Sequence, residues 1–128
     1  MKLLLDTQAL IWFVENNPRL PGKALASIED PANQVFYSAA TIWEMAIKHG
    51  LGKLPLKKPL NESFRMLLES NGLNFLPITF DHAAGVARLP KHHADPFDRL
   101  LIVQSQLEGM RPVSGDDTWD KYSVRRLW

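Results

Sequence analysis

A short apolar run that ends at an acid opens the chain. Residues 2–5 include three consecutive leucines, and Asp6 follows them directly. A run of this kind is typical of a strand covered on both faces, as in a parallel sheet, rather than of a strand with one face in water. The run therefore indicates a sheet buried between helices, with Asp6 at the carboxyl end of its first strand.

Patterns typical of strands and helices alternate along the rest of the chain. We expect strands at residues 2–5, 34–37, 74–78, 111–114 and 124–128. We expect helices at about residues 7–15, 22–30, 39–49, 61–70, 79–88, 96–108 and 116–121. Strands that alternate with helices are joined by crossovers, which make the sheet mostly parallel and cover both of its faces. The sequence therefore predicts an α/β fold in a single domain that spans residues 1–128.

The composition excludes several classes of function. The chain has 45% hydrophobic and 23% charged residues, the balance of an ordinary globular domain. It has no cysteine, which excludes disulfides, thiolate metal sites and thiol nucleophiles. The chain also lacks the glycine-rich loops that bind nucleotides and the elbow motif of serine hydrolases. No apolar run is long enough to cross a bilayer, and Asp6 interrupts the N-terminal segment as a signal peptide, so we expect a cytoplasmic protein.

Four acids occupy positions where a globular chain normally has apolar or small residues. Asp6 and Asp116 follow two of the expected strands, Glu44 is the only charged residue in an apolar stretch, and Asp98 lies one turn into a helix. Because the carboxyl ends of parallel strands share one edge of a sheet, we expect these carboxylates to meet. Carboxylates in one pocket repel each other unless a cation lies among them. An all-oxygen site favours Mg²⁺ or Mn²⁺ over zinc.

A divalent ion of this kind supports nuclease chemistry, because it polarises a phosphodiester and activates water. Each acid also has a simpler explanation when it is taken alone. Asp6 can cap a helix, Glu44 can pair with Lys48 at i, i+4, and Asp98 suits the positive end of a helix dipole. We interpret Asp95 as the N-cap of the helix at 96–108. The nuclease interpretation therefore depends on all four acids coming together.

The remaining polar and aromatic residues carry weaker signals. The four histidines, at positions 49, 82, 92 and 93, lack zinc-binding spacing, and we interpret them as loop or surface imidazoles. The net charge of +1 gives no overall attraction to a polyanion, so substrate binding depends on local basic residues, for which Lys48, Lys53 and Arg99 are the candidates. We expect Trp43 and Trp119 in the core, with stacking on bases as the alternative.

Four segments together resemble a known family. They are LLLDTQALIW at 3–12, SAATIWEMAIKHGLGKLPL at 38–56, LPKHHADPFDRLLIVQSQLEG at 89–109 and PVSGDDTW at 112–119. They resemble PIN-domain ribonucleases, and specifically the VapC-type toxins of type II toxin–antitoxin systems, over essentially the whole chain. The resemblance implies a three-layer α/β/α PIN-like fold, RNA as the substrate, a homodimer, and a cognate VapB-type antitoxin whose tail blocks the acidic pocket.

The resemblance also implies roles for individual residues. The acidic quartet around the metal would be Asp6, Glu44, Asp98 and Asp116, with Asp95 beside it as a secondary acid and Ser114 orienting the last carboxylate through its hydroxyl. We therefore expect an endoribonuclease that depends on Mg²⁺ or Mn²⁺. Its metal is held by Asp6, Asp98 and Asp116, directly or through water, while Glu44 helps to bind metal or to position the attacking water.

Two other functions remain open from the sequence. The first is a catalytically silent PIN-like module that binds RNA or protein and uses its acids as a docking pocket for a basic partner. The second, an aspartyl-phosphate enzyme, fits poorly, because the phosphatase form usually needs a second aspartate two residues after the first, where this chain has Gln8.

Overall fold

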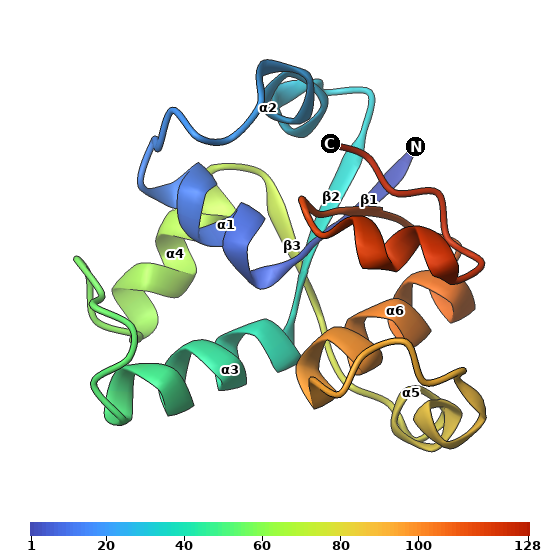
Figure 1. Ribbon diagram of the computed structural model, residues 1–128. Helices are drawn as coiled ribbons and strands as arrows, with labels where there is room; N and C mark the ends of the chain where they lie inside the picture. The colour runs from blue at the N-terminus through green and yellow to red at the C-terminus, as the bar shows by residue number, and fades with distance from the viewer.

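A four-stranded parallel sheet forms the centre of the computed structural model, which describes residues 1–128 (Figure 1). The strand order is β3-β2-β1-β4, and every neighbouring pair is parallel. The strands are β1 (Lys2–Leu5), β2 (Gln34–Ser38), β3 (Leu73–Leu76) and β4 (Arg111–Val113). The leucine run is therefore a central strand, with β2 on one side and β4 on the other, as its continuous apolar character predicts.

The two faces of the sheet are covered by different helices. Leu3 and Leu5 contribute to one core and Leu4 to the other, because successive side chains of a strand point to opposite faces. The first core is closed mainly by α1 (Thr7–Val14), α2 (Gly22–Glu29) and α4 (Glu62–Ser70). The second is closed by α6 (Pro96–Glu108) and the 3₁₀ helix η2 (Asp117–Lys121). The expected three-layer α/β/α arrangement is confirmed.

One helix contributes to both cores. Helix α3 (Ala39–Gly50) follows β2 directly, and Ser38 caps it by accepting a hydrogen bond from the Ala40 N–H. Ala40 packs in the second core and Met45 in the first. Helix α3 therefore lies at the carboxyl edge of the sheet, between the layers (Figure 1).

Polar caps begin and end α6, the helix with the clearest sequence signals. The Asp95 carboxylate accepts from the N–H groups of Phe97 and Asp98, Pro96 occupies the first turn, and Gly109 ends the helix in the left-handed conformation with φ 64°. A residue with a side chain is strained at such a φ, whereas glycine is not. The N-cap role expected for Asp95 is therefore confirmed.

Three expected elements differ from the structure. The helix expected at 79–88 is split into α5 (Phe80–Gly85) and a 3₁₀ turn, η1 (Val86–Arg88), and the helix expected at 116–121 is the 3₁₀ helix η2. The strand expected at 124–128 is reduced to one bridge between Val113 and Leu127, since Leu127 turns into the first core. No helix has the length and apolar character needed to cross a membrane.

Candidate metal centre

The carboxyl edge of the sheet brings the four predicted acids together. Asp6 follows β1 directly, Asp116 follows β4 after Ser114 and Gly115, Glu44 lies in α3, and Asp98 lies in the first turn of α6. The charges of Glu44 and Asp116 act on Asp6, and those of Asp6 and Glu44 act on Asp98. Residues from four separate parts of the chain thus form one acidic cluster.

Asp6 lies at the buried side of the cluster, with 8% of its surface exposed. Its Oδ1 accepts a hydrogen bond of 2.7 Å from the Ala9 N–H and caps α1. Burial raises the pKa of the Asp6 carboxyl to about 6, since hydrogen bonds from Ser114 and Ala9 offset only part of the desolvation, and repulsion from Glu44 and Asp116 adds to it. The Asp6 side chain therefore caps α1 and also belongs to the acidic cluster.

Asp98 has the most strongly raised pKa of the cluster. Burial, followed by repulsion from Asp95, raises the pKa of its carboxyl to about 7, while the charge of His93 acts in the opposite direction. Asp95 caps α6 and also places a second negative charge beside Asp98. The position of Asp95 thus agrees with that of a secondary acid next to the site.

Glu44 is buried and has two partners. One carboxylate oxygen accepts a hydrogen bond from the Thr7 hydroxyl, and the other pairs with the Lys48 ammonium one turn along α3. This hydrogen bond raises the pKa of Lys48 above its ordinary value. Lys48 therefore holds a carboxylate of the site, and its expected contact with substrate phosphates stays a prediction.

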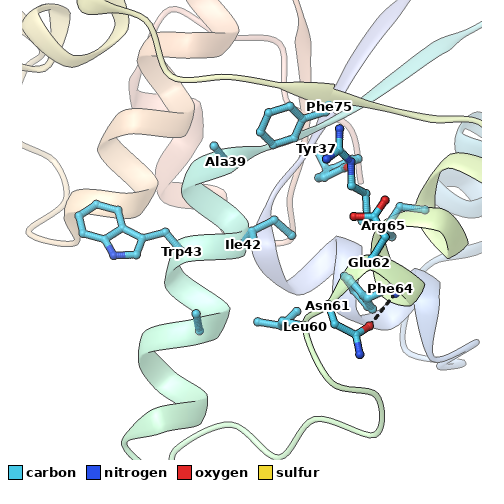
Figure 2. Close-up of a pocket in the computed structure, with 12 residues that line it drawn as sticks. Tyr37, Ala39, Ile42, Trp43, Leu60, Asn61, Glu62, Phe64, Arg65 and Phe75 are labelled. Carbon is cyan, nitrogen blue, oxygen red and sulfur yellow. Dashed lines mark hydrogen bonds between the residues drawn. The ribbon is translucent and has the colours of Figure 1, made fainter.

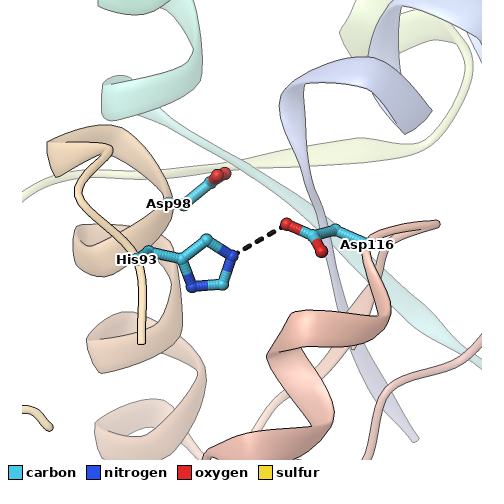
Figure 3. Close-up of side chains that lie close together, drawn as sticks. All are labelled: His93, Asp98 and Asp116. Atoms are coloured by element: carbon cyan, nitrogen blue, oxygen red, sulfur yellow. Dashed lines mark hydrogen bonds and ion pairs between the residues drawn. The ribbon is translucent and has the colours of Figure 1, made fainter. Parts of the chain in front are cut away.

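Asp116 faces His93, which the sequence did not identify as a site residue. The Oδ2 atom of Asp116 lies 2.8 Å from Nε2 of His93, and its Oδ1 accepts from the Thr118 N–H (Figure 3). Burial acts to raise the pKa of Asp116, but the hydrogen bonds from His93 and Thr118 outweigh it and lower this pKa below its ordinary value. Ligand atoms of His93, Asp98 and Asp116 all lie within 4.8 Å of one another.

The prediction of loop or surface imidazoles is wrong for His82, which is buried in α5, whereas His93 lies in a loop as predicted but is largely buried. The side chain of His93 is only 10% exposed, and its ring stacks on Tyr122. His82 is 1% exposed and contacts Glu108 through Nε2. Zinc motifs are recognised by spacing along the chain, whereas His93 reaches the acids through the loop before α6. The only feature of the sequence that could have indicated a site role for His93 is its position two residues before Asp95, the N-cap of α6.

The Ser114 hydroxyl lies between two of the acids. Ser114 is fully buried, and its Oγ accepts a hydrogen bond of 3.1 Å from the backbone N–H of Asp116. Its side chain also hydrogen-bonds to Asp6. The structure thus places this hydroxyl at the backbone of Asp116 and the carboxylate of Asp6, rather than at the carboxylate of Asp116 as expected.

The other two candidates for phosphate binding lie elsewhere. Arg99 is buried, and its guanidinium donates to the carbonyl oxygens of Val86, Leu89 and Pro90. These bonds fix the segment between η1 and α6, and a contact of Arg99 with substrate stays a prediction. Lys53 is exposed in the loop that follows α3.

The two tryptophans differ in their surroundings. Trp119 is buried in the second core, as expected. Trp43 was expected in the core but is 58% exposed, and its ring packs edge-on against that of Phe97 with the ring centroids 5.2 Å apart. Trp43 also borders an apolar pocket of about 470 Å³ between α3 and α4 (Figure 2). None of the four acids lines this pocket, so it is separate from the acidic cluster.

A divalent cation fits the donor set of the cluster. Burial and mutual repulsion raise the pKa values of Asp6 and Asp98, which shows that their negative charges are poorly compensated by the side chains around them. Lys48 forms an ion pair with Glu44 and His93 with Asp116, and neither forms an ion pair with Asp6 or Asp98. Closely spaced carboxylate oxygens are the ligands that Mg²⁺ and Mn²⁺ bind.

Residues 3–124, nearly the whole chain, match the PIN domain family. The chain belongs to the PIN domain family. The resemblance found from the sequence motifs is thereby confirmed, and the acidic cluster lies within the matched region of this PIN domain.

Individual proteins of known sequence or structure are similar to this PIN domain. Ribonuclease VapC16 of Mycobacterium tuberculosis is 35% identical over 71 residues, which cover 52% of this PIN domain and 49% of VapC16, so the match spans about half of that relative. The VapBC2 complex of Rickettsia felis, bound to a promoter DNA fragment, contains a chain that matches with a TM-score of 0.72 at 16% identity, covering 99% of this chain and 98% of that one. A toxin–antitoxin complex of Klebsiella pneumoniae matches with a TM-score of 0.67 at 20% identity, covering 98% and 96%. At these identities the two structures establish the fold.

Proposed function

We propose that this PIN domain is a metal-dependent endoribonuclease and that it acts as the toxin of a toxin–antitoxin pair. The observation that carries the proposal is the convergence of Asp6, Glu44, Asp98 and Asp116 at the carboxyl edge of the sheet, with the pKa values of two of them raised. The relative named as a ribonuclease and the toxin–antitoxin complexes of the same fold support it.

We assign different roles to the residues of the cluster. Asp6, Asp98 and Asp116 would hold Mg²⁺ or Mn²⁺ directly or through water. When bound, such an ion supplies positive charge that polarises the phosphodiester and lowers the pKa of water. Glu44 would help to bind the metal or orient the attacking water, which forms the new P–O bond and loses its proton to solvent, while the leaving oxygen takes a proton from solvent as its bond to phosphorus breaks. Thr7 and Lys48 fix the Glu44 carboxylate for this role.

Cleavage of RNA by the purified protein tests the proposal. We expect cleavage with Mg²⁺ or Mn²⁺, none with EDTA, and a rate lowered by about 10²-fold or more in Asp6→Asn, because removal of one group that stabilises a transition state typically has this effect. Asp120→Asn is the matched control, since Asp120 is exposed and pairs with Arg126 outside the cluster. Cleavage that survives both EDTA and Asp6→Asn would refute the mechanism. Tight partner binding without cleavage of any RNA would instead support a silent binding module.

The proposed role as a toxin also implies partners. We infer a cognate VapB-type antitoxin whose tail blocks the acidic cluster, a homodimeric toxin, and action on RNA in the cytoplasm. Co-expression with the product of a neighbouring small reading frame should yield a stable complex in which cleavage is inhibited. Sedimentation of the toxin alone would show a dimer, and a monomer at all concentrations would contradict this part of the proposal.

A further inference from the structure

The imidazole of His93 lies in the acidic cluster in a position suited to a metal ligand. Its Nε2 is 2.8 Å from Oδ2 of Asp116, and both residues lie close to Asp98 (Figure 3). Adjacent donor atoms around an octahedral ion with bonds of about 2.1 Å are separated by about 3.0 Å. The nitrogen and the oxygen are therefore already spaced almost as two neighbouring ligands of one ion.

Contacts on the far side of the ring hold His93 in this orientation. Its Nδ1 lies 3.1 Å from the Tyr122 hydroxyl, the ring stacks on Tyr122, and its edge faces buried Trp119. Histidines that bind metals usually have the second ring nitrogen fixed by such a partner. Tyr122 also accepts a hydrogen bond from the His92 N–H, which fixes its hydroxyl oxygen.

The Tyr122 hydroxyl can hydrogen-bond to Nδ1 of His93 with or without a bound metal. In the tautomer with the hydrogen on Nε2, His93 would donate to Asp116 and Nδ1 would accept from the Tyr122 hydroxyl. In the other tautomer Nδ1 would donate to the hydroxyl oxygen, which would leave the lone pair of Nε2 free to hold a metal. Because a hydroxyl both donates and accepts, either tautomer is satisfied without repacking.

We propose that His93 is a direct ligand of the metal, beside Asp98 and Asp116, and that it makes the site prefer Mn²⁺ over Mg²⁺. The inference rests on the proposed metal-dependent function and adds a nitrogen ligand to the acids. Mg²⁺ prefers oxygen ligands and keeps its waters, whereas an imidazole nitrogen favours transition-metal ions. The site therefore differs from an all-carboxylate site in the ion that it selects.

Pulsed EPR of Mn²⁺ bound to the purified protein tests the coordination directly. We expect a hyperfine coupling from one imidazole ¹⁴N, which changes to the ¹⁵N pattern when histidine alone is labelled. This measurement needs no variant, so it decides the question even where a substitution at position 93 impairs folding. Bound Mn²⁺ without a histidine coupling would overturn the inference and leave the metal-dependent function standing.

Calorimetric titration with Mn²⁺ and with Mg²⁺ tests the selectivity. His93→Phe keeps a ring against Tyr122 but removes both nitrogens, and His92→Phe is the matched control because its ring packs edge-on against Tyr122. We expect His93→Phe to weaken Mn²⁺ binding by about 10- to 100-fold, with Mg²⁺ binding changed by less than about threefold and His92→Phe close to the wild type. Unchanged Mn²⁺ affinity in His93→Phe would overturn the inference. A wild-type protein that binds neither ion would overturn the proposed function as well.

Discussion

Replacement of Asp6 by asparagine should stabilise the metal-free protein at neutral and alkaline pH. The carboxyl of Asp6 has its pKa raised from 3.8 to about 6 in the folded protein, mainly by burial. Each pKa unit corresponds to about 1.4 kcal/mol, so ionised Asp6 costs the fold about 3 kcal/mol. Asparagine is a comparable N-cap and keeps the oxygen that accepts from Ala9, but it carries no charge.

The pH dependence of this effect follows from the direction of the shift. Because the folded state binds the Asp6 proton more tightly than the unfolded state, the stabilisation from this proton is complete below pH 3.8 and is lost as the pH rises through about 6. The wild type should therefore lose about 2.5 kcal/mol more than Asp6→Asn between pH 4 and pH 8.

Urea unfolding in EDTA at pH 4, 6 and 8 measures this difference, with unchanged m-values as the check on two-state behaviour. Asp120→Asn is the control, because Asp120 is exposed and its pKa is lowered by the hydrogen bond from Arg126, so this substitution should not stabilise the protein at pH 8. Saturating Mn²⁺ should make the wild type more stable than Asp6→Asn, since binding stabilises the wild type more than a variant that lacks a ligand. Equal pH dependence in the wild type and Asp6→Asn would refute the reasoning.

Three further substitutions test the packing of the fold through their free energies of unfolding. Gly50→Ala at the end of α3 should stabilise by about 0.5–1 kcal/mol, because its Cβ meets nothing within 4 Å. Gly85→Ala should destabilise by about 1–3 kcal/mol, because its Cβ would lie 2.8 Å from Cγ1 of Val103, and a stabilising effect would contradict this packing. Arg99→Gln should destabilise by about 1–3 kcal/mol through lost bonds to carbonyl groups, while the RNA affinity of the folded protein stays unchanged. A selective loss of RNA binding would instead support a substrate role for Arg99.

Local sequence patterns predicted most of the elements because they depend on short-range geometry. The leucine run after Lys2 gives β1, and the sequence from Asp95 to Pro96 begins α6 with a cap and a fixed φ. The parallel order of the strands then follows from the alternation with helices, and it places Asp6 and Asp116 at one edge. The acidic cluster was therefore predictable in outline.

Long-range packing decided the partners of individual side chains. Sequence patterns placed Arg99 at the substrate and Trp43 in the core, but the fold turns Arg99 toward carbonyl groups and leaves Trp43 exposed. His93 lies in a loop, where no periodicity indicates which way a side chain points, and it meets Asp116 only because α6 packs beside η2. The sequence by itself determined the strands, the caps and the edge where the acids gather, since these depend on backbone preferences over a few residues. Only the tertiary structure decided which imidazole joins the acids, because that choice depends on contacts between residues far apart in the chain.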